Sequence, residues 1–266
     1  MLEIEFAQIS HPGSVRDHNE DYLGHAPPGS VEEARSHGWL FALADGVGGQ
    51  DRGEVASRLA VETLLAGFRK ANGSEPLTSL LSRLIQAANA QVFEAGLTST
   101  PGRAAMATTI VASALRFDRV TVAHAGDSRC YLIRQGYAVP LTRDHTVSSE
   151  QLRLGLITSR EAASAQTSHL LSRALGNEMF LTVETSEHQI FPGDSLLLCS
   201  DGLHHSVEPD DIVSLTAAKS PLEEIAAQLI ALANQRDGSD NISVQLIRVQ
   251  SVERVGIYRG RHYKIQ

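Results

Sequence analysis

Residues 40–57 read LFALADGVGGQDRGEVAS, and the interpretation of the whole chain depends on this stretch. Its first five residues are apolar and are typical of a short buried strand, which places Asp45 at the strand end, where its side chain can reach solvent. The glycines of residues 46–49 then allow a tight turn and a close backbone approach to a ligand. From Val55 onward, apolar residues recur at spacings of three and four, which predicts an amphipathic helix. An isolated Asp-Gly is usually only a turn, so the meaning of Asp45 depends on the rest of the chain.

The composition excludes several classes of protein. With 266 residues, 42% hydrophobic and 20% charged, the chain can bury a full core. A net charge of -8 argues against a nucleic-acid partner, which usually requires a basic face. Cys130 and Cys199 lie inside apolar, strand-like runs, which predicts buried free thiols and suits a reducing cytoplasm. The sequence has no signal peptide and no apolar run approaching the roughly 20 residues of a membrane span, so we expect a cytoplasmic protein without a membrane partner.

The remaining patterns predict strands and helices in separate blocks. Alternation at the N-terminus predicts a half-buried strand, and helical spacing over residues 76–97 predicts a second helix after the first. From Met106, apolar runs separated by turn residues are typical of an antiparallel meander, with Asp127 in a hairpin turn. This order lacks β-α-β alternation and predicts an α+β fold, in which a sandwich of two sheets is covered by helix pairs. Later strands are expected at 181–190, 194–199 and 242–249, and later helices at 209–216 and 221–234.

Two further segments depart from this pattern. Residues 142–176 form a long, partly helical excursion, which is typical of a lid or binding loop, although a simple connection is the default. Residues 251–266 are basic and lack a packing pattern, so they are interpreted as a tail or the start of a linker. We therefore expect one domain over residues 1–250.

Polar motifs lie at the ends of the expected elements. They read GSVRDHNED at 13–21, ADGVGG at 44–49 with GEVAS at 53–57, ATT at 107–109, AGDSR at 125–129, LTRDHT at 141–146 with LSRALG at 171–176, SDG at 200–202 and SDNIS at 239–243. Each motif alone is weak. In this order, over about residues 6–249, they resemble the metal-dependent type 2C family of Ser/Thr protein phosphatases, in particular its bacterial members. The family implies a four-layer α/β/β/α sandwich with two central, mostly antiparallel sheets.

The resemblance implies a centre of two divalent ions, Mn²⁺ or Mg²⁺, with a third ion more weakly held. Such hard cations prefer carboxylate, carbonyl and water ligands, and acids at strand ends can converge on one edge of a sandwich. By resemblance, Asp45 bridges the two ions and Asp21 acts through bound water. The other implied ligands are Glu20 and the Gly46 carbonyl for one ion, Asp201 and Asp240 for the second, and Asp127 with Asp201 for the third.

The implied reaction is hydrolysis of phosphoserine and phosphothreonine in proteins, by direct attack of a hydroxide that bridges the ions. Arg16 would hold the phosphate oxygens, because a planar guanidinium binds them in a bidentate manner. Neither cysteine has a role as nucleophile. Residues 142–176 correspond to the flap of the family, which borders the active site and is implied in substrate choice. The expected partners are phosphorylated targets of a Ser/Thr kinase, and the expected state is a monomer.

The sequence departs from the family at two positions. Val47 stands where many members have a histidine proposed as general acid, so the proton for the leaving group is expected from water. His205 stands where many members have an aspartate. His204 and His205 are interpreted as exposed or capping residues, with a role as acid or ligand as the alternative.

Two other functions are compatible with parts of the pattern. One is a catalytically silent regulator on the same scaffold that binds metal or phosphopeptides, which the complete set of expected ligands argues against. The other is a metal-dependent phosphodiesterase acting on nucleotides or nucleic acid, which the acidic balance argues against.

Overall fold

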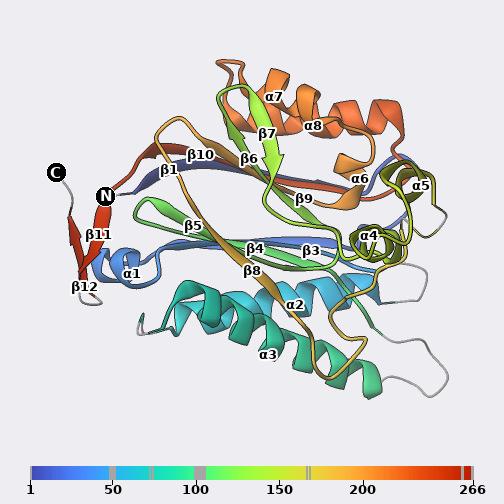
Figure 1. Ribbon diagram of the computed structural model, residues 1–266, viewed down its shortest axis with the longest axis horizontal. Coiled ribbons are helices and arrows are strands. Elements are labelled where there is room, and N and C mark those ends of the chain that lie inside the picture. Colours follow the sequence, from blue (N-terminus) through green and yellow to red (C-terminus); the bar gives the residue numbers. More distant parts are fainter. Residues whose placement is uncertain are drawn as a thin grey trace.

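Two five-stranded antiparallel sheets stack face to face in the computed structural model, and helices cover their outer faces (Figure 1). The α+β class and the α/β/β/α sandwich are therefore confirmed. The glycines expected to turn the chain at positions 48 and 49 lie outside the described residues. The structure describes residues 2–47, 52–71, 73, 75–98, 106–165, 167, 169–258 and 261–264.

The strands are divided between the sheets in an order that mixes the two ends of the chain. The first sheet has the order β1 (Glu3–His11), β10 (Ile242–Ser251), β9 (Ser195–Cys199), β6 (Arg129–Arg134) and β7 (Tyr137–Pro140). The second sheet has the order β2 (Asp21–Ala26), β3 (Trp39–Asp45), β4 (Ile110–Arg116), β5 (Arg119–Ala125) and β8 (Glu184–Gln189).

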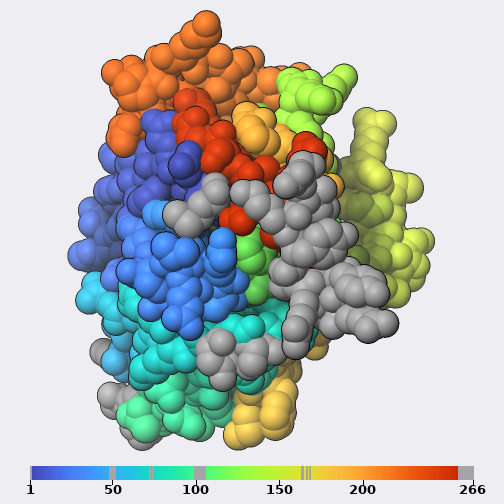
Figure 2. Space-filling model, turned by 90° about the vertical axis from the view of Figure 1, so that its left-hand side faces the viewer, coloured from blue at the N-terminus to red at the C-terminus, as the bar shows by residue number. Residues whose placement is uncertain are grey.

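Helix pairs form the two outer layers, which lie at opposite ends of the molecule in Figure 2. On the second sheet they are α2 (Gly53–Arg69) and α3 (Leu77–Leu97), and on the first α7 (Pro209–Thr216) and α8 (Leu222–Arg236). The shorter helices are α1 (Val31–Ser36), α4 (Val147–Arg153), α5 (Ser159–Ser164) and α6 (Asp201–His204). The excursion at residues 142–176, here called the flap, carries α4 and α5 and projects from the side of the sandwich in Figure 2. None of the described helices is long and apolar enough to cross a membrane.

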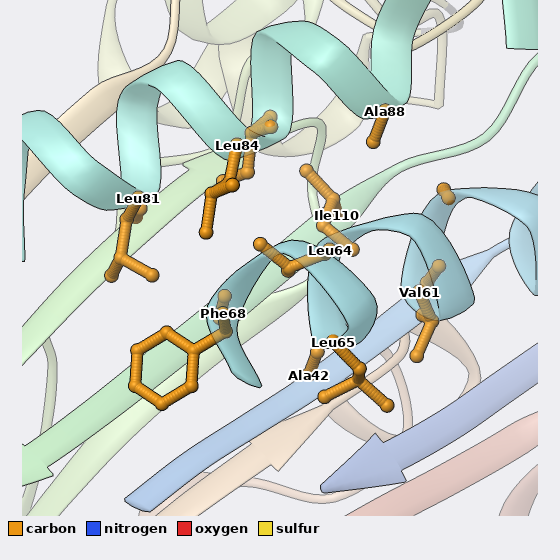
Figure 3. Close-up of a cluster of buried hydrophobic side chains, with 14 of the residues drawn as sticks. Ala42, Val61, Leu64, Leu65, Phe68, Leu81, Leu84, Ala88 and Ile110 are labelled. Carbon is orange, nitrogen blue, oxygen red and sulfur yellow. The ribbon is translucent and has the colours of Figure 1, made fainter. Parts of the chain in front are cut away.

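Strand β3 is buried on both of its faces, which explains its continuous apolar run. Leu40, Ala42 and Ala44 face the cluster under α2 and α3, where Figure 3 shows Phe68 and other helix residues converging on the sheet. The alternate residues Phe41 and Leu43 face the cluster between the two sheets. Fully burying one such large side chain contributes about 1.5–3 kcal/mol, so the strand that ends at Asp45 is held firmly.

The structure corrects the predicted meander. β5 and β6 belong to different sheets, so the chain crosses between the sheets at Gly126 and Asp127, and Asp127 is not in a hairpin turn. Gly126 has φ +114, and a Cβ there would lie 2.6 Å from the Thr109 side chain. The strand pattern was correct, but it carries no information about which strands pair.

Three short elements were not expected from the sequence: β2, α1 and α6. In addition, β11 (Val255–Tyr258) and β12 (Arg261–Lys264) form an antiparallel pair inside the segment interpreted as a tail or linker. Cys130 and Cys199 are buried and unpaired with each other, as expected.

Candidate metal centre

Asp21 and Asp45 lie opposite each other in neighbouring strands of the second sheet, Asp21 at the start of β2 and Asp45 at the end of β3. Directly opposed residues share one face with Cβ atoms about 4.5–5.5 Å apart. The backbone of Asp45 is fixed, because its N–H donates to Thr109 Oγ1 at 2.9 Å and its carbonyl accepts from Thr108 Oγ1 at 2.8 Å. Burial raises the pKa of the Asp45 carboxyl well above its usual range, and the charge of Asp21 raises it further. This site therefore favours a proton or a cation beside Asp45.

Asp21 is buried and keeps one oxygen without a partner. Its Oδ2 accepts a hydrogen bond from Ser200 Oγ at 2.8 Å, whereas Oδ1 has no hydrogen-bond partner among the described residues. Burial raises the pKa of Asp21 to about 7. A buried carboxylate oxygen without a donor is costly unless water or a cation satisfies it.

Glu20 lies against the start of α2. A Cβ on Gly53 would come within 2.8 Å of the Glu20 carboxyl carbon, so a larger residue at position 53 would displace the Glu20 carboxylate from the place it occupies. Gly46 N–H donates to the Glu20 carbonyl at 3.1 Å, and Ser57 Oγ donates to the same carbonyl at 2.6 Å. Burial raises the pKa of Glu20, and Glu54 adds to this effect.

Asn241 connects the loop that carries Glu20 to the first sheet. Its side-chain NH₂ donates to the carbonyls of Pro12 and His18, both at 2.9 Å. Its side-chain oxygen accepts from Glu20 N–H at 2.8 Å. The loop that precedes β2 is therefore held at the start of β10 by one amide side chain.

The first sheet contributes Asp201 and Asp240. Asp201 follows β9 as the first residue of α6, and Asp240 lies two residues before β10. Burial raises the pKa of Asp201, while His205 lowers it, Asp240 raises it and a hydrogen bond with Asp45 lowers it. The charge of Asp201 in turn raises the pKa of Asp45 on the second sheet. The carboxylates of the two sheets therefore meet at one seam.

Asp127 borders the same cluster from the crossover between the sheets. It is buried, and burial together with the charge of Asp201 raises its pKa to about 7. Its carbonyl accepts a hydrogen bond from His204 Nε2 at 2.9 Å. His204 is only 9% exposed and its ring binds this backbone carbonyl, so the expectation that it is an exposed or capping residue is wrong. His205 is partly exposed and lies near Asp201.

The chemistry of these side chains fits Mg²⁺ or Mn²⁺. The donors of the cluster are carboxylate and carbonyl oxygens, the type that hard divalent ions prefer. Burial has raised the pKa of several acids together, and one buried oxygen lacks a donor. Divalent cations bound among these carboxylates would favour their ionised forms and would give the unpaired Asp21 oxygen a partner.

Arg16 and Val47 lie at the rim of the cluster. Arg16 is half-exposed and donates to the Asp240 carboxylate at 3.0 Å and to the Ser239 carbonyl at 3.3 Å. Val47 is 41% exposed and offers no proton, as expected from its position after the Asp-Gly pair. The structure therefore brings Arg16 to the acidic cluster but pairs it with an acid.

The flap is tied to the cluster at both of its ends. At its start, Asp144 accepts from Arg129 Nε and Nη2 at 2.8 and 2.7 Å. At its end, Leu175 exchanges backbone hydrogen bonds with Thr108, the residue whose hydroxyl holds the Asp45 carbonyl.

A family model described as protein phosphatase 2C matches residues 17–246. The chain belongs to this family. It is a metal-dependent protein serine/threonine phosphatase of the 2C type.

Named relatives agree with this assignment. The serine/threonine phosphatase stp of Listeria welshimeri is 34% identical over 252 residues, which cover 94% of this chain and 95% of that protein. The serine/threonine protein phosphatase PstP of Mycobacterium tuberculosis is 37% identical over 249 residues, which cover 91% of this chain and 44% of that protein.

Solved structures of the family superpose over nearly the whole phosphatase. The Streptococcus agalactiae serine/threonine phosphatase gives a TM-score of 0.85 at 30% identity and covers 93% of this chain and 100% of that one. The catalytic domain of PstP in complex with two manganese ions gives a TM-score of 0.78 at 32% identity, covering 94% of this chain and 100% of that one.

Sequence reasoning missed the residues that hold the acids in place. Asn241, Ser200 and Thr109 all lie inside quoted motifs, but none was assigned a role. Of the three, only Asn241 could have been predicted from the sequence. An amide side chain directly after an acid, at the start of a strand, is well placed to bind a neighbouring loop. Ser200 and Thr109 look like ordinary strand-end residues until their partners are known.

Proposed function

We propose that the acidic cluster at the seam of the two sheets is the catalytic centre of this phosphatase and holds two Mg²⁺ or Mn²⁺ ions, with Asp45 between them. The observation that carries the proposal is a buried oxygen of Asp21 that has no hydrogen-bond partner among the described residues and lies beside Asp45, whose pKa is raised well above its usual range. The proposed ligands are Glu20, Asp21 acting through water, Asp45, the Gly46 carbonyl, Asp201 and Asp240, with Asp127 and Asp201 for a third ion.

The proposed assignment of ligands to the two ions follows from the position of each ligand in the fold. Glu20 and Gly46 lie against the start of α2 and would hold one ion, whereas Asp201 and Asp240 adjoin strands of the first sheet and would hold the other. Asp45 is held by Thr108 and Thr109 between them. Divalent ions bound there would polarise the phosphate and make bound water acidic enough to act as nucleophile near neutral pH.

Arg16 is proposed to bind the phosphate oxygens of the substrate. Its ion pair with Asp240 is half-exposed and therefore weak, so the guanidinium can exchange a carboxylate for a phosphate with little cost. A cation on Asp240 would weaken that pair further and release Arg16. A planar guanidinium then matches two phosphate oxygens at once. Val47 cannot donate a proton, so the leaving serine or threonine oxygen is proposed to take its proton from water.

The substrates are proposed to be phosphoserine and phosphothreonine in proteins that a Ser/Thr kinase modifies, and the catalytic unit is proposed to be one domain over residues 1–250, acting as a monomer. Support comes from the relatives, which are named serine/threonine phosphatases. A cytoplasmic location is proposed as well, since the two buried free cysteines suit a reducing compartment.

The test is phosphate release from a phosphothreonine peptide with Mn²⁺, with excess chelator, and with Asp45→Ala. We expect the chelator or the substitution to remove nearly all activity. Asp210→Ala is the matched control, because Asp210 is an exposed acid in the first turn of α7, and its variant should keep full activity. Circular dichroism checks that each variant is folded. Activity that survives in Asp45→Ala or in chelator would refute the proposed centre.

A further inference from the structure

A second cluster of potential metal ligands lies beside the acidic centre and includes nitrogen donors. It consists of His169, Asp201 and His205, each with a ligand atom within 4.8 Å of the others. His205 Nδ1 lies 3.7 Å from Asp201 Oδ2, and the rings of His169 and His205 are nearly perpendicular with their centroids 4.9 Å apart. Two imidazoles and one carboxylate therefore converge on one point at the edge of the centre.

The backbone around each imidazole is held in place. His205 follows α6 directly, and its N–H donates to the Asp201 carbonyl at 2.9 Å. His169 is in the flap, where the next residue, Leu170, accepts a backbone hydrogen bond from Val147 at 2.8 Å. The cluster therefore joins two segments far apart in the sequence, the flap and α6.

One of the three ligand separations is close to that of a real metal site, and the other two are within 4.8 Å. At metal–ligand distances of about 2.0–2.1 Å, two ligands of a tetrahedral ion lie about 3.4 Å apart. The His205–Asp201 separation of 3.7 Å is near this value, and small side-chain rotations would close the difference. Three protein ligands leave a fourth position for water or substrate.

Two neighbouring side chains are held by other partners. His204 donates its Nε2–H to the Asp127 carbonyl, which leaves its buried Nδ1 without a hydrogen-bond partner among the described residues, and Asp144 is held by the Arg129 guanidinium. The cluster thus differs in chemistry from the oxygen-only donors of the main centre. Imidazole suits Zn²⁺ and related transition ions, whereas Mg²⁺ prefers oxygen.

We propose that His169, Asp201 and His205 form a site for a borderline transition-metal ion, Zn²⁺ being the best match, and that the ion fastens the flap to α6. The inference rests on the proposed function only in that Asp201 also serves the main centre. Binding would hold the flap against the rim of the active site. Access of a protein substrate would then depend on an ion of a different class from the catalytic ones.

The test uses the full chain in saturating Mg²⁺, which supplies the oxygen-only sites, and titrates Zn²⁺ against a chromophoric chelator. We expect one zinc equivalent whose affinity falls at least about tenfold in His169→Gln and in His205→Gln, since even outer-shell partners of metal ligands contribute 10- to 100-fold. His188→Gln is the matched control, because His188 is a partly buried histidine on β8 bonded to Ser186. Its zinc affinity should stay unchanged.

A second readout is independent of phosphatase activity. In NMR spectra of the histidine side chains, Zn²⁺ should shift the ring signals of His169 and His205 and leave His188 in place. Equal zinc affinity in wild type and both variants, or unshifted ring signals, would overturn the proposal. Asp45→Ala separates the two hypotheses, because it should abolish Mn²⁺-dependent phosphate release yet keep the zinc-induced shifts. Retained phosphatase activity in that variant would contradict the proposed function alone.

Discussion

Asn241→Ala should destabilise the protein and weaken its metal centre at the same time. The side chain is 5% exposed and makes three hydrogen bonds, two to the carbonyls of Pro12 and His18 and one from Glu20 N–H. Each such bond contributes about 0.5–1.5 kcal/mol net, so we expect a loss of about 3 kcal/mol in the free energy of unfolding. The Glu20 loop would then lose its hydrogen bonds to the start of β10 and be held less firmly, so the Mn²⁺ concentration for half-maximal activity should rise at least about tenfold.

Asn89→Ala provides the matched control. Asn89 is also buried and also makes three hydrogen bonds, to the carbonyls of Glu178 and Met179 and from Gly176 N–H, but it joins α3 to the last residue of the flap and the segment after it. Denaturant unfolding in chelator should show similar losses for both variants. Only Asn241→Ala should change the Mn²⁺ requirement. A loss below about 0.5 kcal/mol for Asn241→Ala, or an equal Mn²⁺ effect in Asn89→Ala, would refute the reasoning.

The remaining predictions concern pH, the phosphate ligand and the flap. The folded-state pKa values of Asp21 and Asp127 are raised to about 7, so the metal-free protein should lose stability as the pH rises from about 4 to about 7. The free energy of unfolding should fall by up to about 1.4 kcal/mol per pH unit for each of the two groups. Denaturant unfolding in chelator across this pH range measures the change, and a rise in stability would contradict the prediction. Arg16→Lys should raise KM for a phosphothreonine peptide roughly tenfold, and Arg16→Ala should raise it further, because the bidentate contact is lost; steady-state kinetics that give an unchanged KM for Arg16→Ala would exclude the assigned role. Asp144→Asn should loosen the flap, since the Arg129 guanidinium loses its charged partner; limited proteolysis should then cut the flap several-fold faster, and an unchanged cleavage rate would show that this ion pair does not hold it.

The sequence predicted β3 well because one physical cause dominates there. A strand buried on both faces needs a continuous apolar run, and Leu40 to Ala44 supply it with no competing signal. The helices α2 and α3 were predicted for a similar reason, since their apolar faces keep a strict period over many residues. The assignment of Asp45 to a strand end followed directly from this strand.

Pairing and short elements could not be predicted in the same way. The sequence DYLGHA of β2 mixes Asp21, Gly24 and His25 with apolar residues, and it is a strand because it pairs with β3. The sequences of β5 and β6, with the short turn between them, are typical of a hairpin. In the structure β5 instead pairs with β8 and β6 with β9, strands that come much later in the chain. The sequence around His169 does not indicate its neighbours in space, because these are Asp201 and His205, at the start and just after the end of α6.

The position of the acids implies that folding and metal binding are coupled. Asp21 and Asp45 belong to the second sheet, whereas Asp201 and Asp240 adjoin β9 and β10 of the first, so ions held among them would bridge the two halves of the sandwich. Without cations, burial and mutual repulsion oppose ionisation of Asp21, Asp45 and Asp201, and this cost destabilises the contact between the two sheets. Ions that bind only the folded state stabilise it by an amount that grows with the logarithm of the free ion concentration above Kd. If the proposed centre is correct, the carboxylates that serve the reaction also couple the stability of the fold to the bound ions.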